Sequence, residues 1–589
     1  MRYIHRLTCL LLLSLVVGCA APSVTPTRPL ATATSTATIE IPTPTPTIEA
    51  ETATPTIAVS PTPTAKVETA TPVARATPQV MAGPFWWNDA VFYEIFVRSF
   101  YDSDGDGVGD LNGVIEKLDY LNDGDPTTTE DLGVTGIWLM PIMQSPSYHG
   151  YDITDYYTVD DEYGTNEDFL RLMEEAHRRG IRVIVDLVLN HTSSQHPWFV
   201  SARDDVNSPY RDFYIWSEEN PGYKGPWGGK VWHRCSTGYY YGIFWEGMPD
   251  LNYNNPAVTA EMEKVIRFWL EDMGADGFRL DAVKHLIEEG RVQENTPATH
   301  EWLRGFYAFY KGINPDAMTV GEVWSSTTEV VKYIGDQLDL AFEFDTAQAT
   351  LRSAKFEDRS HILRAHRLST ERYPPNQFAT FLTNHDQERA MSELRENVNR
   401  AKTAASLLLT GPGVPFLYYG EEIGHIGGKP DENIRTPMQW SDEDNAGFTT
   451  AMIAWRAPQP NYREVNVAAQ TDDPDSLLSH YRRLIHVRHD HAALRIGDWR
   501  EVEVEDKRIY AFLRHSDEET LLVLINLGGE PISDYSLSLP EGPLSEGSAS
   551  EVFTGAPVSA PTINAEGGFD DYTPLAELAP YSTYIIRIE

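Results

Sequence analysis

Residues 277–281 read Gly-Phe-Arg-Leu-Asp, a short and mostly apolar run that ends in a carboxylate. Seven further apolar runs are present, and longer amphipathic segments such as Asn166–Arg179 and Thr259–Met273 separate most of them. Eight strands alternating with helices predict an α/β fold, a (β/α)8 TIM barrel in preference to an open doubly wound sheet. The predicted strands are Val91–Phe96, Gly136–Met140, Arg182–Leu189, Gly277–Leu280, Met318–Val323, Leu338–Phe344, Phe378–Thr383 and Val414–Tyr418.

Spacing along the barrel predicts two additions to it. One βα unit takes about 31 residues, and the chain between the third and fourth strands exceeds this by about sixty. We therefore expect a small domain, residues 191–251, inserted after the third strand of a catalytic barrel formed by residues 84–190 and 252–490. Beyond His491, strand-like segments such as Glu501–Leu513 and Thr520–Ile525 follow one another between Gly/Pro turns. These segments predict a C-terminal antiparallel β-sandwich over residues 491–589.

The N-terminus predicts export. Arg2 and Arg6 precede an apolar stretch, Leu10–Val17, that is too short to span a bilayer. The stretch ends in Val16-Val-Gly-Cys19, which resembles a bacterial lipobox, although an ordinary signal peptide with a chance cysteine is the alternative. We expect residues 1–18 to be a signal peptide and Cys19 to carry lipid. The protein would then be exported and lipid-anchored to the cell membrane, on its extracytoplasmic side.

The segment after Cys19 predicts a tether, and the overall composition limits the classes of partner that the protein can bind. Residues 19–83 are rich in Thr and Pro, which favours a disordered tether. Lys plus Arg total 47 and Asp plus Glu 87, so the net charge is −40. This charge repels nucleic acid and anionic lipid head groups, so we expect no nucleic-acid partner and membrane contact through the N-terminal lipid only. We also expect a monomer. Of the three cysteines, Cys9 would be removed with the signal peptide and Cys19 would carry lipid. Cys235 would then have no partner for an intrachain disulfide.

Acidic residues follow the predicted strands. Asp281, Glu322 and Asp386 each come at or just past a strand end, and Arg279 precedes the first of them by two positions. In a barrel these positions meet at the C-terminal mouth, where such enzymes hold their active sites. One carboxylate can attack a sugar carbon while another protonates the leaving oxygen, so the set is a candidate glycosidase site. For each acid alone, a helix cap or a salt-bridge partner is the more common explanation, and the glycosidase hypothesis rests on all three being in register with the strands.

Four motifs carry a resemblance to a known family. Asp186-Leu-Val-Leu-Asn-His191, Gly277-Phe-Arg-Leu-Asp-Ala-Val-Lys-His285, Gly321-Glu-Val-Trp324 and Phe381-Leu-Thr-Asn-His-Asp386 resemble conserved regions of the α-amylase superfamily of glycoside hydrolases, in that family's order. The resemblance covers the chain from about Pro84 to the C-terminus. Supporting motifs are His149-Gly-Tyr-Asp152, Met248-Pro-Asp-Leu-Asn252, Gly413-Val-Pro-Phe-Leu-Tyr-Tyr-Gly-Glu421 and Arg435-Thr-Pro-Met-Gln-Trp440.

The resemblance implies a role for each residue. Asp281 would be the nucleophile, Glu322 the general acid and then base, and Asp386 the stabiliser of the transition state. Arg279 would keep Asp281 ionised, since a neighbouring cation lowers the pKa of a carboxyl group. The remaining implied substrate-binding residues are Tyr151, Asp152, His191, Lys284, His285, His385 and Arg435.

Residues 102–110, Asp-Ser-Asp-Gly-Asp-Gly-Val-Gly-Asp, start like an EF-hand loop, but its twelfth position is Gly113 instead of a closing glutamate. An acidic turn without metal is the alternative. The resemblance implies a structural Ca²⁺ loop after the first strand, with Asp102, Asp104, Asp106, the Val108 carbonyl and Asp110 as ligands. It also implies a second Ca²⁺ site between the inserted domain and the barrel, from Asn190, Asp250 and His285. Ordinary hydrogen bonding of Asp250 and His285 is the alternative.

The motifs disagree about the branch of the family to which the chain is most similar. Lys284-His285 is an α-amylase feature, while the Arg435 motif resembles the α-glucosidase, oligo-1,6-glucosidase and trehalose synthase branches. The motif at Met248 resembles bacterial α-amylases between the neopullulanase and oligo-1,6-glucosidase branches. Asp152 and Arg435 match a pair that closes the pocket of exo-acting relatives, or else bridges the barrel mouth beside an open cleft. We expect an open cleft and an α-amylase acting on internal α-1,4 bonds of starch, glycogen or maltooligosaccharides. An exo-acting glucosidase, a transglycosylase and a non-catalytic binding protein are the alternatives.

Overall fold

A computed structural model describes residues 85–588, all within one unit of the chain, Ala76–Glu589. The predicted signal peptide, Cys19 and the predicted tether lie outside the described residues. None of the described helices combines the length and apolar character needed to cross a membrane.

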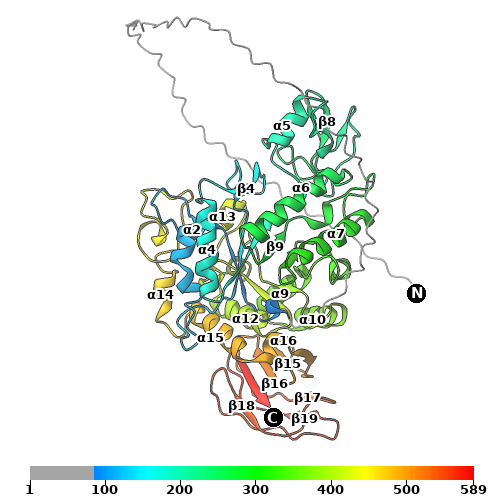
Figure 1. Cartoon of the computed structure of the whole chain (residues 1–589). Coiled ribbons are helices and arrows are strands. Elements are labelled where there is room, and N and C mark those ends of the chain that lie inside the picture. The colour runs from blue at the N-terminus through cyan, green and yellow to red at the C-terminus, as the bar shows by residue number, and fades with distance from the viewer. Residues whose placement is uncertain (1–84, 589) are drawn as a thin grey trace, which may run out of the picture. The chain divides into compact units, whose positions relative to one another are not determined.

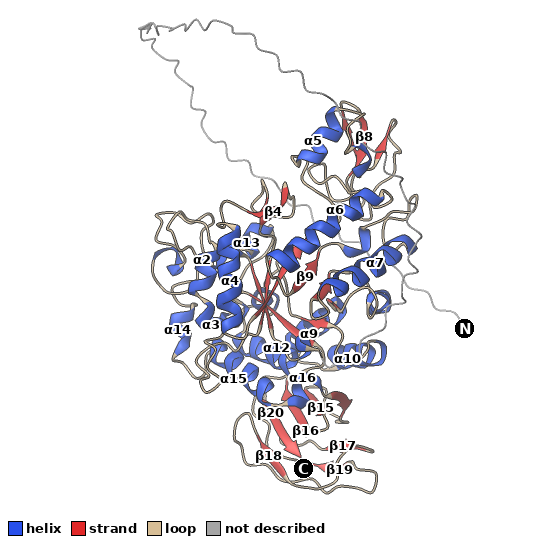
Figure 2. Cartoon of the chain, viewed as in Figure 1, coloured by secondary structure: helices blue, strands red, loops and turns tan. Residues whose placement is uncertain are grey.

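Eight parallel strands form the centre of the fold, in the order β11-β10-β9-β5-β2-β1-β13-β12. A parallel bridge between Phe342 and Ala379 joins the two outer strands, with Glu343 N donating to Ala379 O at 2.9 Å, so the sheet closes into a barrel. Figure 2 shows the strands converging at the centre, with helices around them. The (β/α)8 TIM barrel expected from the sequence is confirmed. Its strands are β1 Phe92–Ile95, β2 Gly136–Leu139, β5 Arg182–Leu187, β9 Gly277–Leu280, β10 Met318–Gly321, β11 Leu340–Ala341, β12 Ala379–Thr380 and β13 Val414–Tyr418.

Two barrel strands are shorter than their apolar runs predict. The runs Leu338–Phe344 and Phe378–Thr383 give only two-residue strands, β11 and β12. Both lie at the closing edge, where a single bridge replaces a ladder. The apolar run measures burial, which continues beyond the residues that pair.

Amphipathic helices follow the strands and cover the barrel (Figure 1). Thr165 caps α4, and its side chain and that of Asp168 form a reciprocal capping box. Prolines at the first turn start α6 and α7, where a missing backbone N–H costs nothing. The longer helices are α4 Asn166–Arg178, α6 Pro256–Arg267, α7 Pro297–Ile313, α9 Phe344–Phe356, α10 Ser360–Arg372, α12 Val398–Thr410 and α15 Leu477–Asp490. Shorter ones include α2 Leu111–Glu116, α8 Thr327–Val330, α11 Ala390–Glu393, α13 Asp431–Ile434, α14 Val467–Thr471 and α16 Ala492–Ile496. The predicted helix Thr259–Met273 is α6 followed by a π-helical turn, Phe268–Asp272.

The residues after β5 form the predicted insertion. They contain α5 Pro197–Asp204 and a three-stranded antiparallel sheet, β6 Trp216–Ser217, β8 Gly238–Tyr241 and β7 Trp232–Cys235. An antiparallel bridge pairs His191 with Asp250, so the chain leaves and rejoins the barrel at neighbouring positions. The exact boundaries, 191 and 251, stay predictions.

Antiparallel sheets follow the barrel at the C-terminus, as expected. One has the order β14-β15-β16-β20-β18 and the other pairs β17 with β19. Side chains of both, including Leu513, Leu522, Leu539 and Phe569, share one apolar core. The strands are β14 Asp498–Glu501, β15 Ile509–His515, β16 Thr520–Asn526, β17 Leu537–Leu539, β18 Ala549–Glu551, β19 Phe569–Tyr572 and β20 Thr583–Ile588.

The prediction of one strand over Glu501–Leu513 is wrong. Asp506 accepts a hydrogen bond from the backbone N–H of Arg508, and this turn separates β14 from β15. Arg514 of β15 is fully buried against the barrel, where it donates to the carbonyls of Thr410 and Gly497, each at 3.0 Å.

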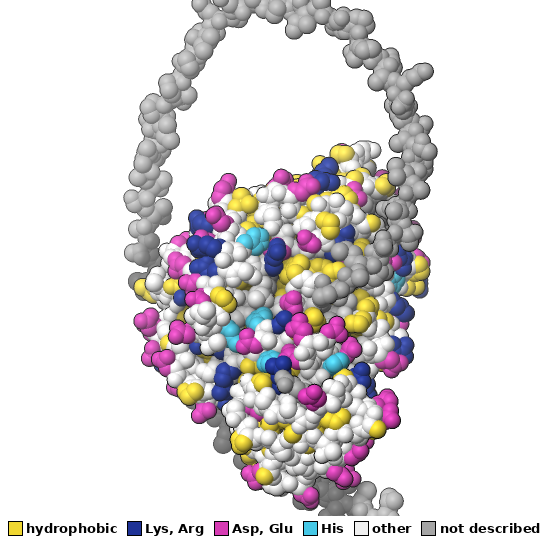
Figure 3. Space-filling model, turned by 60° about the horizontal axis from the view of Figure 1, so that its bottom comes forward, with side chains coloured by type: hydrophobic (Ala, Val, Ile, Leu, Met, Phe, Trp, Pro, Cys, Tyr) yellow, Lys and Arg dark blue, Asp and Glu magenta, His cyan; other side chains and the backbone are white. Residues whose placement is uncertain are grey.

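Figure 3 shows the acidic side chains of this strongly anionic chain spread over the face it presents, interspersed with Lys and Arg.

Candidate active site

The inward face of the barrel changes from apolar to polar along each strand. Phe92 of β1, Ile184 of β5 and Val320 of β10 belong to one buried cluster inside the barrel. Side chains two positions apart in a strand share a face. Glu94, Asp186 and Glu322 therefore point inward at the C-terminal ends of these strands. Arg279 does so within β9, and Asp281 does so directly after it. The alternation of the strands alone builds a charged layer on top of an apolar floor.

Arg279 holds this layer together. Its side chain is fully buried, with Nη1 2.7 Å from Asp281 Oδ1 and Nη2 2.7 Å from Glu322 Oε2. Nη1 also lies 3.0 Å from Asp186 Oδ2. A planar guanidinium with several fixed donors suits this task, because it orients two carboxylates at once. The two acids predicted to act on the sugar thus share one cation.

The acids differ in their pKa values. Burial raises the pKa of Glu322 to about 7, against the opposing charge of Arg279, so its carboxyl can carry a proton near neutral pH. Burial raises the pKa of Asp281 too, but Arg279 favours its ionised form. For Asp386, burial would raise the pKa, yet the charges of His385, Arg435 and Arg279 lower it to about 2. Pairs of acids with diverging environments are typical of acid–base sites.

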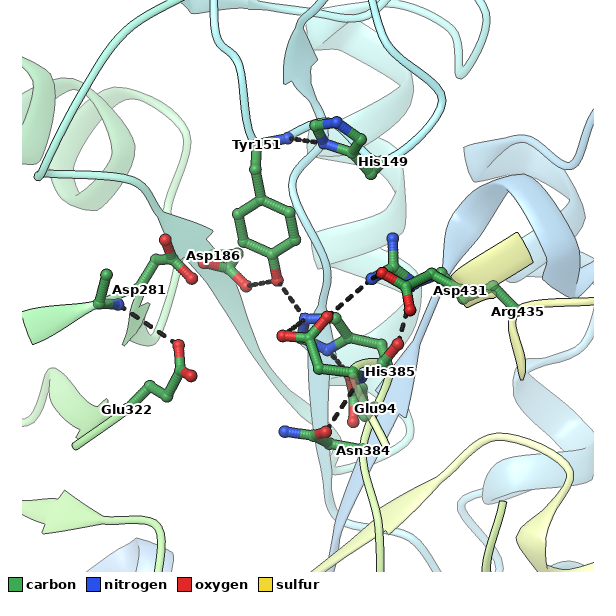
Figure 4. Close-up of polar contacts among 12 residues, drawn as sticks. Glu94, His149, Tyr151, Asp186, Asp281, Glu322, Asn384, His385, Asp431 and Arg435 are labelled. Atoms are coloured by element: carbon green, nitrogen blue, oxygen red, sulfur yellow. Dashed lines mark hydrogen bonds and ion pairs between the residues drawn. The ribbon is translucent and has the colours of Figure 1, made fainter. Parts of the chain in front are cut away.

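His385 and Tyr151 connect Asp386 to the barrel wall. The Tyr151 hydroxyl donates to Asp186 Oδ2 at 3.0 Å and accepts from His385 Nε2 at 2.9 Å. Figure 4 shows Tyr151 between Asp186 and His385. His385 Nδ1 lies 2.5 Å from Glu94 Oε1. Burial would lower the pKa of His385, but the charges of Asp386 and Glu94 outweigh it and raise this pKa, which favours the cationic form of the imidazole.

Ala282, directly after the predicted nucleophile, has a left-handed backbone with φ 48° and ψ 34°. A residue with a Cβ pays about 1–2 kcal/mol for this conformation. The turn aims the Ala282 N–H toward Glu322 Oε2, at 3.4 Å, and places Ala282 in the cavity wall. Strain of this kind is common at active sites.

These residues border a cavity of about 720 Å³, which also reaches the inserted segment. The side chains of the three acids line it, together with aromatic residues from the insertion and from the end of β10. The lining residues are Tyr148, His149, Tyr151, His191, Trp227, Phe244, Trp245, Met248, Asp281, Ala282, Lys284, His285, Glu322, Trp324, Asp386, Asp431 and Arg435. All predicted catalytic and substrate-binding residues except Asp152 and the buried Arg279 and His385 are among them.

Asp152 and Arg435 do not form the predicted pair. Arg435 Nη2 lies 2.7 Å from Asp386 Oδ1 and 3.6 Å from Asp431 Oδ2. Figure 4 shows Arg435 beside Asp431. Asp152 Oδ1 instead accepts hydrogen bonds from the hydroxyls of Ser145, at 2.9 Å, and Ser147. The two side chains thus form no direct bridge, and the expected open cleft beside them stays a prediction.

The remaining predicted contacts lie on the Glu322 side of the cavity or at the neck of the insertion. Lys284 Nζ donates to Trp324 O at 2.9 Å and pairs with Glu294. His285 Nδ1 lies 2.7 Å from Gln293 O. His191 Nε2 lies 3.1 Å from Tyr151 O, and burial lowers the pKa of His191 to about 3, so it is neutral.

The predicted Ca²⁺ loop brings part of its ligand set together. One carboxylate oxygen each from Asp102, Asp104 and Asp106 lies within 4.8 Å of the others. Asp110 is differently used, since it accepts from Gly113 N at 2.7 Å and caps α2. An all-oxygen set suits Ca²⁺, so the first three aspartates fit the ion and would hold it. Ion binding there stays a prediction.

The residues of the second predicted Ca²⁺ set make hydrogen bonds within the protein, but only Asn190 and His285 bond to each other. Asn190 Nδ2 donates to His285 O at 2.8 Å, and Asp250 Oδ1 accepts from Ile243 N at 3.0 Å. Asp250 Oδ2 is buried without a hydrogen-bond partner among the described residues. Burial, and then the nearby Glu288, raise the pKa of Asp250, which favours its neutral form. This second site also stays a prediction.

Several site residues were missed by the sequence reasoning. Asp186 and Glu94 had a readable signal, because each is an acid inside an otherwise apolar strand. Asp431 had none, since it opens the short helix α13 within a polar stretch of sequence. Trp227, Phe244 and Trp245 come from an insertion without periodicity.

A barrel with an apolar interior, whose mouth holds two acids on one arginine and gives one of them a pKa of about 7, suits a glycoside hydrolase. The sequence matches the family described as "Alpha amylase, catalytic domain" over residues 94–497. It is 42% identical over 448 residues to "Alpha-amylase 3" of Dictyoglomus thermophilum, covering 75% of this chain and 85% of that protein. It is 34% identical over 523 residues to the "Oligo-1,6-glucosidase" of Parageobacillus thermoglucosidasius, covering 75% and 90%. The crystal structure of the alpha-amylase from H. orenii superimposes with a TM-score of 0.74 at 41% identity, over 85% of this chain and 99% of that one. The chain belongs to the alpha-amylase family of glycoside hydrolases.

Proposed function

We propose that the enzyme is an α-amylase that cleaves internal α-1,4-glucosidic bonds of starch, glycogen or maltooligosaccharides with retention of anomeric configuration. The observation that carries this is the cavity itself. At about 720 Å³ it lies in the upper part of the roughly 300–1,000 Å³ range of ligand pockets, and exposed aromatic side chains extend it beyond the acids. A chain-shaped substrate needs such an extended surface. The 42% identity to a protein named alpha-amylase supports the same choice.

The proposed chemistry has two displacement steps. Asp281 attacks the anomeric carbon while Glu322 gives its proton to the leaving oxygen, so the glycosidic C–O bond breaks and a glycosyl ester forms. Glu322 then accepts a proton from water, which attacks the same carbon and releases Asp281. The raised pKa of Glu322 suits the first step, and ionisation after its proton is lost suits the second.

Asp386 and Arg279 support these steps without exchanging protons. With a pKa of about 2, Asp386 stays ionised and can accept hydrogen bonds from sugar hydroxyls at all working pH values. Arg279 orients both reacting carboxylates through its two terminal nitrogens. The hydrogen bond between Tyr151 and His385 fixes the position of the aromatic ring against which the sugar ring would pack.

Product analysis on soluble starch tests the proposal. We expect a rapid loss of iodine staining while maltose, maltotriose and longer maltooligosaccharides accumulate. Glucose as the only early product would favour the exo-acting glucosidase instead. Rearranged disaccharides from maltose would indicate a trehalose-synthase-like transglycosylase, and complete inactivity a non-catalytic binding protein.

We further propose that the enzyme is lipid-anchored outside the cytoplasm through Cys19, works as a monomer and carries one structural Ca²⁺ at Asp102, Asp104 and Asp106. The lipobox-like sequence supports the lipid anchor, and the clustered aspartates support the ion. Replacing Cys19→Ala should move the protein from the membrane fraction to the medium or periplasm. Unchanged membrane association would argue for an ordinary signal peptide with a chance cysteine.

A further inference from the structure

Exposed large aromatic side chains gather at one place in this protein. Among the described residues, the exposed Phe and Trp side chains are Trp227, Phe244, Trp245, Trp324 and Phe356, with exposures from 37% to 63%. All but Phe356 line the catalytic cavity. Leaving so much apolar surface in water is unfavourable, so a concentrated patch marks a binding surface. Trp227 is the most exposed of the group, at 63%.

Trp227 stands at the tip of a short hairpin. Lys224 and Lys230 pair across its base, and Gly228 N donates to Gly225 O at 2.9 Å. The four residues Gly-Pro-Trp-Gly thus form a β-turn with proline in its second position, which fixes the tip. Gly228 has φ +78°, a conformation that a residue with a Cβ would resist. The sequence therefore builds a defined turn to present one tryptophan.

The tip rests on the cavity wall without burying the tryptophan. The Trp227 ring stacks with Phe244, with centroids 5.5 Å apart and planes 28° from parallel, and meets the edge of His285 at 5.4 Å. The indole N–H of Trp227 donates to no atom of residues 85–588. One polar donor and an open ring face are what an aromatic residue offers to an amphipathic ligand such as a sugar ring.

The location assigns Trp227 to the leaving-group side. The acid that protonates the leaving oxygen must face the leaving sugar, so that sugar lies next to Glu322. Trp324 follows Glu322 by two residues, and its carbonyl accepts from Lys284. Lys284 is followed in sequence by His285, against which Trp227 packs. These contacts lead from the acid to Trp227 along one wall.

We propose that Trp227 is a specificity-determining residue that stacks on a glucose residue of the leaving group and so gives the enzyme its preference for longer maltooligosaccharides. This inference rests on the proposed function. It adds which residue of the chain selects for substrate length, and on which side of the scissile bond.

Steady-state hydrolysis of maltoheptaose and maltotriose tests it. Trp227→Ala should lower kcat/KM for maltoheptaose by about three- to tenfold, the scale of one lost aromatic contact, and change that for maltotriose less than twofold. Trp227→Phe should restore most of the preference because it keeps a ring face, whereas Trp227→Leu should not. Phe356→Ala, which removes an aromatic side chain of 59% exposure outside this cavity, is the matched control.

A binding measurement separates stacking from folding. In a Glu322→Gln background, Trp227→Ala should weaken calorimetric binding of maltoheptaose by the same factor, with an unchanged melting temperature. If the wild type prefers maltoheptaose and both Trp227→Ala and Trp227→Leu keep that preference, the inference is overturned while the proposed function stands. A wild type without any preference for the longer chain would instead contradict the proposed function.

Discussion

Glu421 gives the most quantitative prediction, because it is a buried acid with a half-satisfied carboxyl group. It follows β13 and is 7% exposed. Its Oε1 accepts from the Tyr481 hydroxyl at 2.8 Å, while Oε2 has no hydrogen-bond partner among the described residues. Burial raises the pKa of Glu421 from 4.5 to about 8. The folded protein therefore keeps a proton that the unfolded chain releases.

The sign of the effect follows from proton binding. Below pH 4.5 both states are protonated and the group contributes nothing. Between pH 4.5 and about 8 the folded state binds more protons, so stability falls as pH rises through this window. A rise of about three and a half pKa units, at about 1.4 kcal/mol each, gives an upper bound of about 5 kcal/mol lost by pH 8.

Glu421→Gln removes the titration and keeps the shape. The amide oxygen can still accept from Tyr481, and the amide N–H replaces the hydroxyl of the neutral acid. We expect the free energy of unfolding of the variant, relative to wild type, to increase by about 2–5 kcal/mol between pH 5 and pH 8. Urea unfolding at the two pH values measures this. Glu443→Gln, at an exposed position, controls for the loss of one negative charge from a chain of net charge −40. An equal stability difference at pH 5 and pH 8 would refute the reasoning.

Three further predictions concern the site. Because the pKa of Glu322 is raised to about 7, kcat/KM for maltoheptaose should fall above pH 7, and a pH profile that stays level to pH 9 would contradict its role as the acid. Asp281→Ala should reduce turnover of starch by at least about 10³-fold while starch binding in a pull-down assay is retained, and substantial residual hydrolysis would remove Asp281 as nucleophile. Chelation with EDTA should lower the melting temperature by several degrees, and Asp104→Asn should reduce that shift; unchanged melting and metal content would make residues 102–110 an ordinary acidic turn.

The barrel and its acids could be predicted from the sequence because both depend on local pattern. Apolar runs determine which segments are buried, and the residue after a buried parallel strand must lie at the barrel mouth. Asp281 and Glu322 are found by this rule alone, and the family resemblance then assigned their roles.

Pairing between distant loops could not be predicted. The motifs of Asp152 and Arg435 match a pair, but Asp152 accepts hydrogen bonds from the hydroxyls of Ser145 and Ser147. Such local hydroxyl donors leave no periodic pattern in the sequence. The exposure of Trp227 at the cavity could not be predicted either. A Gly-Pro-Trp-Gly sequence predicts a turn, but it does not predict which surface the tip of the turn faces. Strand ends at the closing edge were overestimated because apolar character reports burial and not pairing.

The closing edge of the barrel has a dynamic consequence. Its two sides carry different parts of the catalytic apparatus, since Glu322 stands between β10 and β11 and Asp386 follows β12. One bridge, Phe342 to Ala379, spans that edge, while the other neighbouring strands share longer registers. We expect the Glu343 amide, which donates across it, to exchange its proton with solvent faster than amides within β9 or β13. Transient opening of the closing edge would change the distance between Glu322, the proposed proton donor, and Asp386, the proposed transition-state stabiliser. The barrel would be more flexible at this edge than elsewhere around its circumference.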